Sequence, residues 1–168
     1  MRRFLVITVA AICVLVGSVP ANGLLMRHHD PADVPYETGG SADLDVLGIR
    51  VHRRADGIRM VEFWATTHAG TIGFDAFEVT IDSYGGPEGD FEADCSTTTM
   101  RCTLRSLHGG KSHPATCARR TVSGVEQFVV HVRRTYLRPN KPLRWRVYSD
   151  AGLSETVDMA PNTGWYAP

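Results

Sequence analysis

Residues 47 to 67 read LGIRVHRRADGIRMVEFWATT, and this stretch decides the class of fold. Apolar and polar side chains alternate from Leu47 to His52, which is the period of a β-strand with one buried face. Asp56-Gly57 then tolerates the positive φ angles of a tight hairpin turn. The returning segment, Ile58 to Thr67, is apolar on both faces and is predicted to be a central strand. Its two faces carry Val61, Phe63 and Ala65 on one side and Met60 and Trp64 on the other.

The same period of two continues along the rest of the chain. Phe77, Val79 and Ile81 alternate with polar residues in a third strand, and Tyr84-Gly85-Gly86-Pro87 ends it with a turn. The other expected strands are Asp90 to Cys95, Met100 to Leu107, Ala115 to Val122, Val125 to Arg134 and Leu143 to Ser149. Eight short strands without a convincing helical period predict an all-β fold of two packed antiparallel sheets, a β-sandwich.

The N-terminus has the pattern of a helical secretory signal peptide. Arginines at positions 2 and 3 precede an apolar run of sixteen residues, Phe4 to Val19, and small residues follow. We place the cleavage site after Ala21, which predicts a secreted, extracellular protein. An uncleaved membrane anchor is the alternative, although the run is shorter than the roughly 20 residues that a helix needs to cross a bilayer. A third alternative is a lipoprotein attached through Cys13, which lies behind the bulky Ile12.

The rest of the chain is predicted to form one domain. Residues 22 to 43 mix Pro, Gly, Asp and His without a sustained period, so they are expected to be a flexible leader. Residues 44 to 168 then comprise the β-sandwich domain and a C-terminal tail. Removal of the signal leaves 16 basic and 18 acidic residues, a net charge of about −2. This balance argues against a nucleic-acid-binding protein, which normally has a strong basic excess.

Several short motifs of the domain resemble a group of small exported bacterial β-sandwich proteins. They are Asp43-Leu44-Asp45-Val46, Val79-Thr80-Ile81-Asp82, Cys117 before Phe128-Val129-Val130-His131-Val132, Tyr136-Leu137-Arg138-Pro139, Leu143-Arg144-Trp145-Arg146-Val147 and Asp158-Met159-Ala160-Pro161. The resemblance covers about 115 residues and implies the fold and export, without implying an activity. In that group the position of Tyr136 tends to be a second cysteine, so the resemblance leaves Cys117 without its usual partner.

Three cysteines remain after the signal, in a compartment where disulfides persist. Cys95 and Cys102 lie on adjacent strands of a predicted hairpin, where opposed Cα atoms fall within reach of a disulfide. We predict this pair, with Cys102 to Cys117 as the alternative. The remaining thiol is expected to be buried, or else to link two chains.

Two sets of residues are candidate metal ligands. Carboxylates gather around one predicted loop and fit the oxygen ligands of calcium, at Asp82, Glu88, Asp90 and Asp94. Acidic loops that merely increase solubility are the alternative, and we expect no other cofactor. Cys102, His108, His113 and Cys117 are soft ligands of the kind that zinc takes, although their spacing matches no zinc family. His28-His29-Asp30 is a weaker metal-binding candidate.

Four aromatic residues fall outside the core alternation and are candidates for carbohydrate binding: Tyr84, Tyr148, Trp165 and Tyr166. The alternative for the last two is that they pin the C-terminal tail to the sheet. No nucleophile elbow, metalloprotease helix or phosphate-binding glycine loop occurs, so the sequence does not favour an enzyme. We therefore predict a non-catalytic binding or accessory module whose partner is carbohydrate or another extracellular protein. The alternative is an extracellular hydrolase whose site is assembled from distant loops.

Export makes a direct prediction about the mature N-terminus. Protein recovered from the culture medium should begin at Asn22 or within a few residues of it, because cleavage is expected after Ala21. Edman sequencing of the secreted protein checks this. Intact protein beginning at Met1 in the cytosolic fraction would contradict it.

Overall fold

The computed structural model describes residues 25–29, 43–85, 87–137, 142–151, 157–161 and 164–167. Within these residues all regular structure is antiparallel β-strand, and there is no helix with the length and hydropathy needed to cross a bilayer. The predicted signal peptide, residues 1–21, lies outside the described part. The ten strands are β1 (Leu25–His29), β2 (Leu44–Arg53), β3 (Arg59–Thr67), β4 (Ala76–Asp82), β5 (Phe91–Ser96), β6 (Arg101–Ser106), β7 (Ser112–Val122), β8 (Val125–Arg133), β9 (Arg144–Asp150) and β10 (Val157–Ala160).

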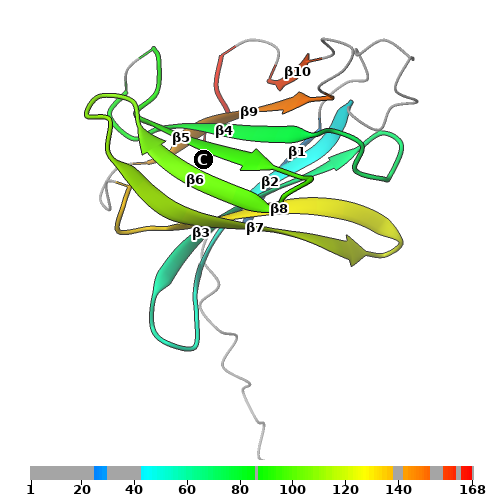
Figure 1. The fold of residues 1–168 in the computed structure, drawn as a ribbon, viewed down its shortest axis with the longest axis horizontal. Coiled ribbons are helices and arrows are strands. Elements are labelled where there is room, and N and C mark those ends of the chain that lie inside the picture. The colour runs from blue at the N-terminus through cyan, green and yellow to red at the C-terminus, as the bar shows by residue number, and fades with distance from the viewer. Residues whose placement is uncertain are drawn as a thin grey trace, which may run out of the picture.

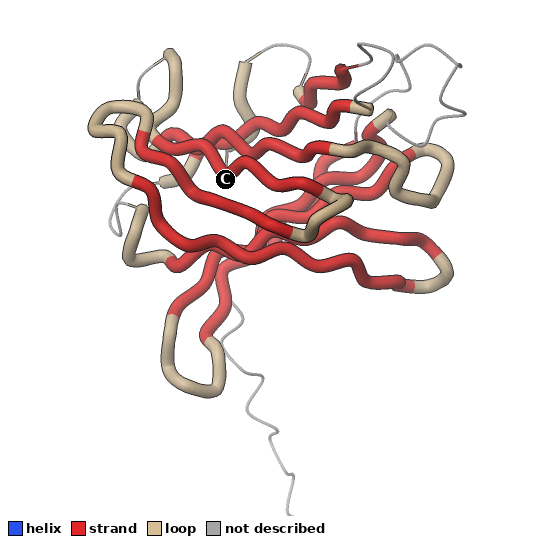
Figure 2. Tube along the Cα trace, in the orientation of Figure 1, coloured by secondary structure: helices blue, strands red, loops and turns tan. Residues whose placement is uncertain are grey.

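The strands form one curled sheet in the order β1-β2-β3-β8-β7-β6-β5-β4-β9-β10 (Figure 1). The sequence predicted two separate sheets, and the difference lies in β7. Its first residues, from Ser112 to Ala115, pair with β6, whereas Thr116 to Val122 pair with β8. One long strand thus connects two halves that fold over each other (Figure 2).

The core fills the space between these two halves. Phe77 of β4 packs on Phe128 of β8 with ring centroids 5.4 Å apart, and Phe74 stacks on Phe77 at the same distance. Phe63 of β3 similarly lies 5.8 Å from Trp145 of β9. The predicted inner faces of β3 and β4 are confirmed, because all six of their side chains are fully buried: Val61, Phe63, Ala65, Phe77, Val79 and Ile81.

The two edges of the sheet meet at a seam. The Leu44 N–H of β2 donates a hydrogen bond to Asp158 Oδ2 of β10 at 2.6 Å. The ring of His28 in β1 stacks on Tyr166 with centroids 4.1 Å apart. Strand β1 lies within residues 22–43, the segment that the sequence predicted to be a flexible leader. All five residues of β1 pair with β2. Residues 22–24 and 30–42 of that segment lie outside the described part.

The predicted disulfide between Cys95 and Cys102 is present. The two residues face each other directly in the register of β5 and β6. Cys117, on β7, is free and half-buried, and burial raises the pKa of its thiol. The alternative pairing of Cys102 with Cys117 is therefore not adopted.

Replacing Cys95 and Cys102 together by serine should destabilise the domain without unfolding it. The bond closes a short loop, for which the loop-entropy model gives about 2.5 kcal/mol, a fraction of the stability of a typical domain. Urea denaturation should show this loss, whereas Cys117→Ser should show a smaller one. Equal midpoints for the double variant and the wild type would contradict the prediction.

Candidate functional site

The candidate site lies on the outer face of the half formed by β1, β2, β3, β8 and β7. Because Val61, Phe63 and Ala65 of β3 point into the core, the intervening Glu62 and Trp64 point to the opposite face. Cross-strand pairing then brings long polar side chains beside them. Glu62 stands opposite Arg50 of β2 on one side and His131 of β8 on the other, and Trp64 stands opposite Gly48.

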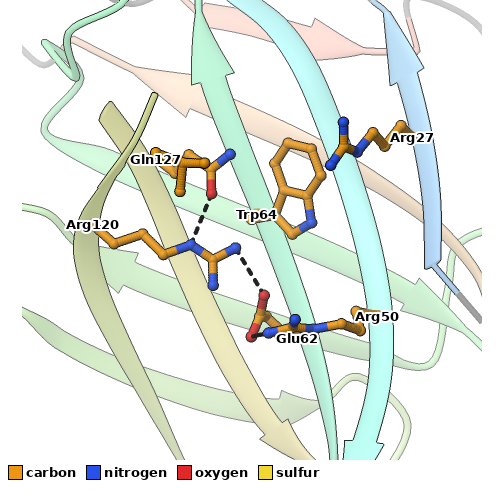
Figure 3. A pocket seen from close by; sticks show the side chains of 7 residues that line it. Arg27, Arg50, Glu62, Trp64, Arg120 and Gln127 are labelled. Atoms are coloured by element: carbon orange, nitrogen blue, oxygen red, sulfur yellow. Dashed lines mark hydrogen bonds and ion pairs between the residues drawn. The ribbon is translucent and has the colours of Figure 1, made fainter. Parts of the chain in front are cut away.

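Glu62 is the centre of an ion-pair cluster (Figure 3). Its side chain is only 2% exposed. Arg50 Nη2 donates a hydrogen bond to Oε2 at 2.7 Å, and His131 Nε2 lies 3.3 Å from the same oxygen. Arg120 Nη2, from β7, lies 2.9 Å from Oε1, as an ion pair without hydrogen-bond geometry. One carboxylate thus holds residues from β2, β7 and β8 together.

Trp64 forms the apolar wall beside this cluster. Its indole lies flat across Gly48, where an added Cβ would come within 2.2 Å of the ring. Only glycine at position 48 leaves room for the indole in this position. The guanidinium of Arg27, from β1, lies over the same ring at 5.6 Å from the centroid, in a cation–π contact. Figure 3 shows Arg27 and Arg120 on opposite sides of Trp64.

A pocket of about 300 Å³ opens between these side chains, and we call it the Glu62 pocket. Three arginines and one carboxylate line it, so the pocket has an excess of positive charge. Arg120 Nε is held in place by Gln127 Oε1 at 2.8 Å, whereas the buried Nε of Arg50 has no hydrogen-bond partner among the described residues. The pocket is lined by Arg27, Arg50, Glu62, Trp64, Arg120, Val122 and Gln127.

The surroundings of Glu62 and His52 determine whether each side chain is charged at neutral pH. Burial raises the pKa of Glu62, but hydrogen bonds from His131 and Arg50 and the charge of Arg120 outweigh it and lower the pKa to about 2. Burial lowers the pKa of the neighbouring His52, and the charge of Glu62 only partly opposes this. At neutral pH the carboxylate is therefore ionised and His52 is neutral.

Asp82, a predicted calcium ligand, is occupied by contacts within the protein. Arg144 Nε donates to its Oδ2 at 2.7 Å, and the backbone N–H groups of Tyr84 and Gly85 donate to Oδ1 at 2.8 and 2.7 Å. Its side chain is 1% exposed. This carboxylate shapes the turn after β4.

The other three predicted calcium ligands have different surroundings from one another. Asp90 accepts hydrogen bonds from the backbone and hydroxyl of Ser83, at 2.6 and 3.1 Å. Glu88 is exposed in the turn, and Asp94 is exposed on β5. Within the described ranges, no group of three or more His, Cys, Asp and Glu side chains is close enough to hold a metal ion. Calcium binding by this set stays a prediction.

The alternative zinc ligands are likewise engaged separately. Cys102 is in the disulfide and Cys117 is a free thiol. His108 Nε2 lies 3.4 Å from Asp90, and the ring of His113 stacks on a tyrosine. Of the histidine doublet, His28 is at the seam, and Asp30 lies outside the described residues.

Of the four aromatic residues predicted as a carbohydrate surface, two lie on either side of one arginine, and the other two have different surroundings. Tyr84 is 53% exposed beside the turn after β4. Tyr148 and Trp165 each contact the guanidinium of Arg146, at 5.5 and 4.7 Å from the ring centroids. Tyr166 exchanges two backbone hydrogen bonds with β9. The last contact fits the alternative in which the C-terminal tail is pinned to the sheet.

The residues of the Glu62 pocket were not predicted from the sequence as a site. Its arginines lie at positions 27, 50 and 120, and only strand pairing brings them together. One local signal was present, because Glu62 is a lone charge in the otherwise apolar segment MVEFWA. A charged residue facing outward from a central strand needs partners on the neighbouring strands.

Comparison with known proteins adds no assignment. No protein-family model, curated protein or solved structure matches the chain. The argument for function therefore depends on the geometry of the Glu62 pocket.

The lowered pKa of Glu62 predicts an acid-sensitive contribution to stability. Because the folded pKa is about 2 against an ordinary 4.5, the contribution is fully present above about pH 4.5 and is lost as the pH falls toward 2. At pH 7 Glu62→Gln should reduce the free energy of unfolding by about 3 kcal/mol, and the difference from wild type should shrink in acid. Urea titrations at pH 7, 5 and 3 measure it.

Glu92→Gln is the matched control, because Glu92 pairs with the exposed Arg105 and such surface pairs contribute about 0 to 1 kcal/mol. A Glu62→Gln difference that stays constant between pH 7 and 3 would contradict the pKa assignment.

Proposed function

We propose that the protein is an exported, non-catalytic binding module that holds a small anionic ligand in the Glu62 pocket. Export is supported by the signal-like N-terminus and by the disulfide, which favours an oxidising compartment. The resemblance to small exported bacterial β-sandwich proteins points the same way. The partner class is an extracellular small molecule or the acidic end of a larger one.

One observation supports this proposal above the others: three arginines line a single pocket, and two of them are held by one buried carboxylate while the third lies over Trp64. Arginine binds carboxylate and phosphate groups through paired N–H donors. Glu62 neutralises only part of the positive charge, so an incoming anion would reduce the remaining excess. Arg27 and Arg120, on either side of Trp64, are accessible to it because they are exposed or half-buried.

The ligand should also donate hydrogen bonds. Gln127 Oε1 accepts one hydrogen bond from Arg120 Nε and also lines the pocket, so it can accept a second one from a ligand hydroxyl. A carboxylate with neighbouring hydroxyls is the chemistry of an acidic sugar. The volume of about 300 Å³ is at the lower end of small-molecule sites and suits one sugar unit.

A hydrolase is the alternative from another class. A catalytic carboxylate at neutral pH needs a pKa near the working pH. Glu62 has the opposite property, because its partners hold the pKa at about 2. The pocket is therefore better suited to binding than to proton transfer.

Calorimetric titration with D-glucuronate, using D-glucose as the uncharged control, tests the proposal. The wild type should bind glucuronate and not glucose. Arg120→Gln should weaken glucuronate binding by about tenfold or more, because a charge-assisted hydrogen bond is lost. The control Arg105→Gln removes an exposed arginine on the other half and should leave binding unchanged. Failure to bind glucuronate, or equal binding of glucose, would refute this ligand class.

A further inference from the structure

A second concentration of positive charge lies at the end of the β2–β3 hairpin, which projects from the body of the protein (Figure 1). The hairpin end, residues 53–59, is joined there by residues 133–135 at the end of β8. These two segments contain five arginines and one acidic residue, Asp56, which pairs with Arg54 at 3.0 Å. The whole chain has a formal net charge of zero, so this is a local excess. The arginines are Arg53, Arg54, Arg59, Arg133 and Arg134.

Backbone contacts fix the arginines beside one another. Arg53 and Arg59 are paired in the strand register, and Arg53 Nη1 donates to the carbonyl of Gly57 at 3.2 Å. The N–H of Arg134 donates to the carbonyl of Arg59 at 2.9 Å. The charges therefore converge because the hairpin end and the end of β8 are hydrogen-bonded neighbours.

Four of these five arginines, all except Arg54, line a concavity of about 540 Å³, which we call the hairpin concavity. It is lined by Arg53, Gly57, Ile58, Arg59, Arg133, Arg134 and Thr135. Among the described residues no carboxylate lines it, in contrast to the Glu62 pocket, where Glu62 offsets part of the charge. The hairpin concavity is therefore suited to a ligand with more negative charge.

Like charges are held close together in this concavity. Burial lowers the pKa of Arg134, and the charge of Arg59 lowers it further. An anion beside the exposed guanidinium of Arg59 would reduce this repulsion and gain charge-assisted hydrogen bonds. The three exposed arginines of the concavity, Arg53, Arg59 and Arg133, can contact more than one anionic group at once.

We propose that the hairpin concavity binds a compact ligand with adjacent phosphate groups, either free in solution or as a lipid headgroup. The guanidinium fork matches the geometry of phosphate oxygens. A single concavity fits a compact polyphosphate, whereas a nucleic-acid duplex needs an extended basic face. This site shares no residue with the Glu62 pocket and does not depend on the function proposed for it.

Titration of the full chain with inorganic tripolyphosphate, followed by calorimetry, tests the site. The wild type should bind, and affinity should fall as salt is raised. Arg59→Gln with Arg133→Gln should weaken binding by about tenfold or more, because two exposed charge-assisted contacts are removed. Arg101→Gln, at an exposed arginine of β6, is the matched control and should bind as the wild type does.

Unchanged affinity in the double variant would overturn the proposal, as would an equal loss in Arg101→Gln. Tighter binding of a DNA duplex than of tripolyphosphate would also overturn it. Co-sedimentation with phosphatidylcholine vesicles, with and without cardiolipin, distinguishes the two sources. Binding that requires cardiolipin supports a headgroup, and tripolyphosphate binding without vesicle binding supports a free ligand. If the protein binds neither tripolyphosphate nor cardiolipin-containing vesicles, the proposed phosphate site is wrong.

Discussion

Alternation along β3 is the constraint on which both faces of the sheet depend. Phe63 reaches across to Trp145 in the opposite half, and this contact belongs to the core. Since neighbouring side chains of a strand point to opposite faces, burial of Phe63 places Glu62 and Trp64 on the outside. A slip of one residue would put the carboxylate into the core and the phenyl ring into water. The hydrophobic core therefore fixes the position of the polar cluster, although the two share no side chain.

The sequence predicted those parts of the fold that depend on neighbouring residues. The alternation of Phe77, Val79 and Ile81, and the short connection between Cys95 and Cys102, are local patterns, and both correspond to the structure. The single curled sheet was not predicted, because β7 changes partners between Ala115 and Thr116 without a break in its sequence pattern. Strand β1 was also missed, since its pairing with β2 crosses fourteen or more intervening residues and leaves no local period.

The candidate site shows the same division between local and long-range information. The carboxylates at Asp82 and Asp90 are close in sequence, and they were predicted as ligands for this reason. Their proximity instead serves the turn between β4 and β5, where backbone N–H groups take up their oxygens. Glu62 has partners that are 12, 58 and 69 positions away in the numbering, at Arg50, Arg120 and His131. Such a cluster is defined by register, which a single sequence does not reveal.

The energetics of buried charge are consistent with the binding role that we propose for this cluster. Removing an ion pair from water costs several kcal/mol, and well-packed apolar side chains often stabilise a protein at least as well. The outer face of β3 already has Trp64 packed across Gly48, so apolar packing is compatible with this position. A buried carboxylate paired with two arginines and a histidine, with one oxygen lacking a hydrogen bond among the described residues, is an inefficient way to stabilise a sheet. It is an efficient way to hold guanidinium groups in a fixed arrangement before a ligand arrives, because the ordering cost has already been met in the folded state.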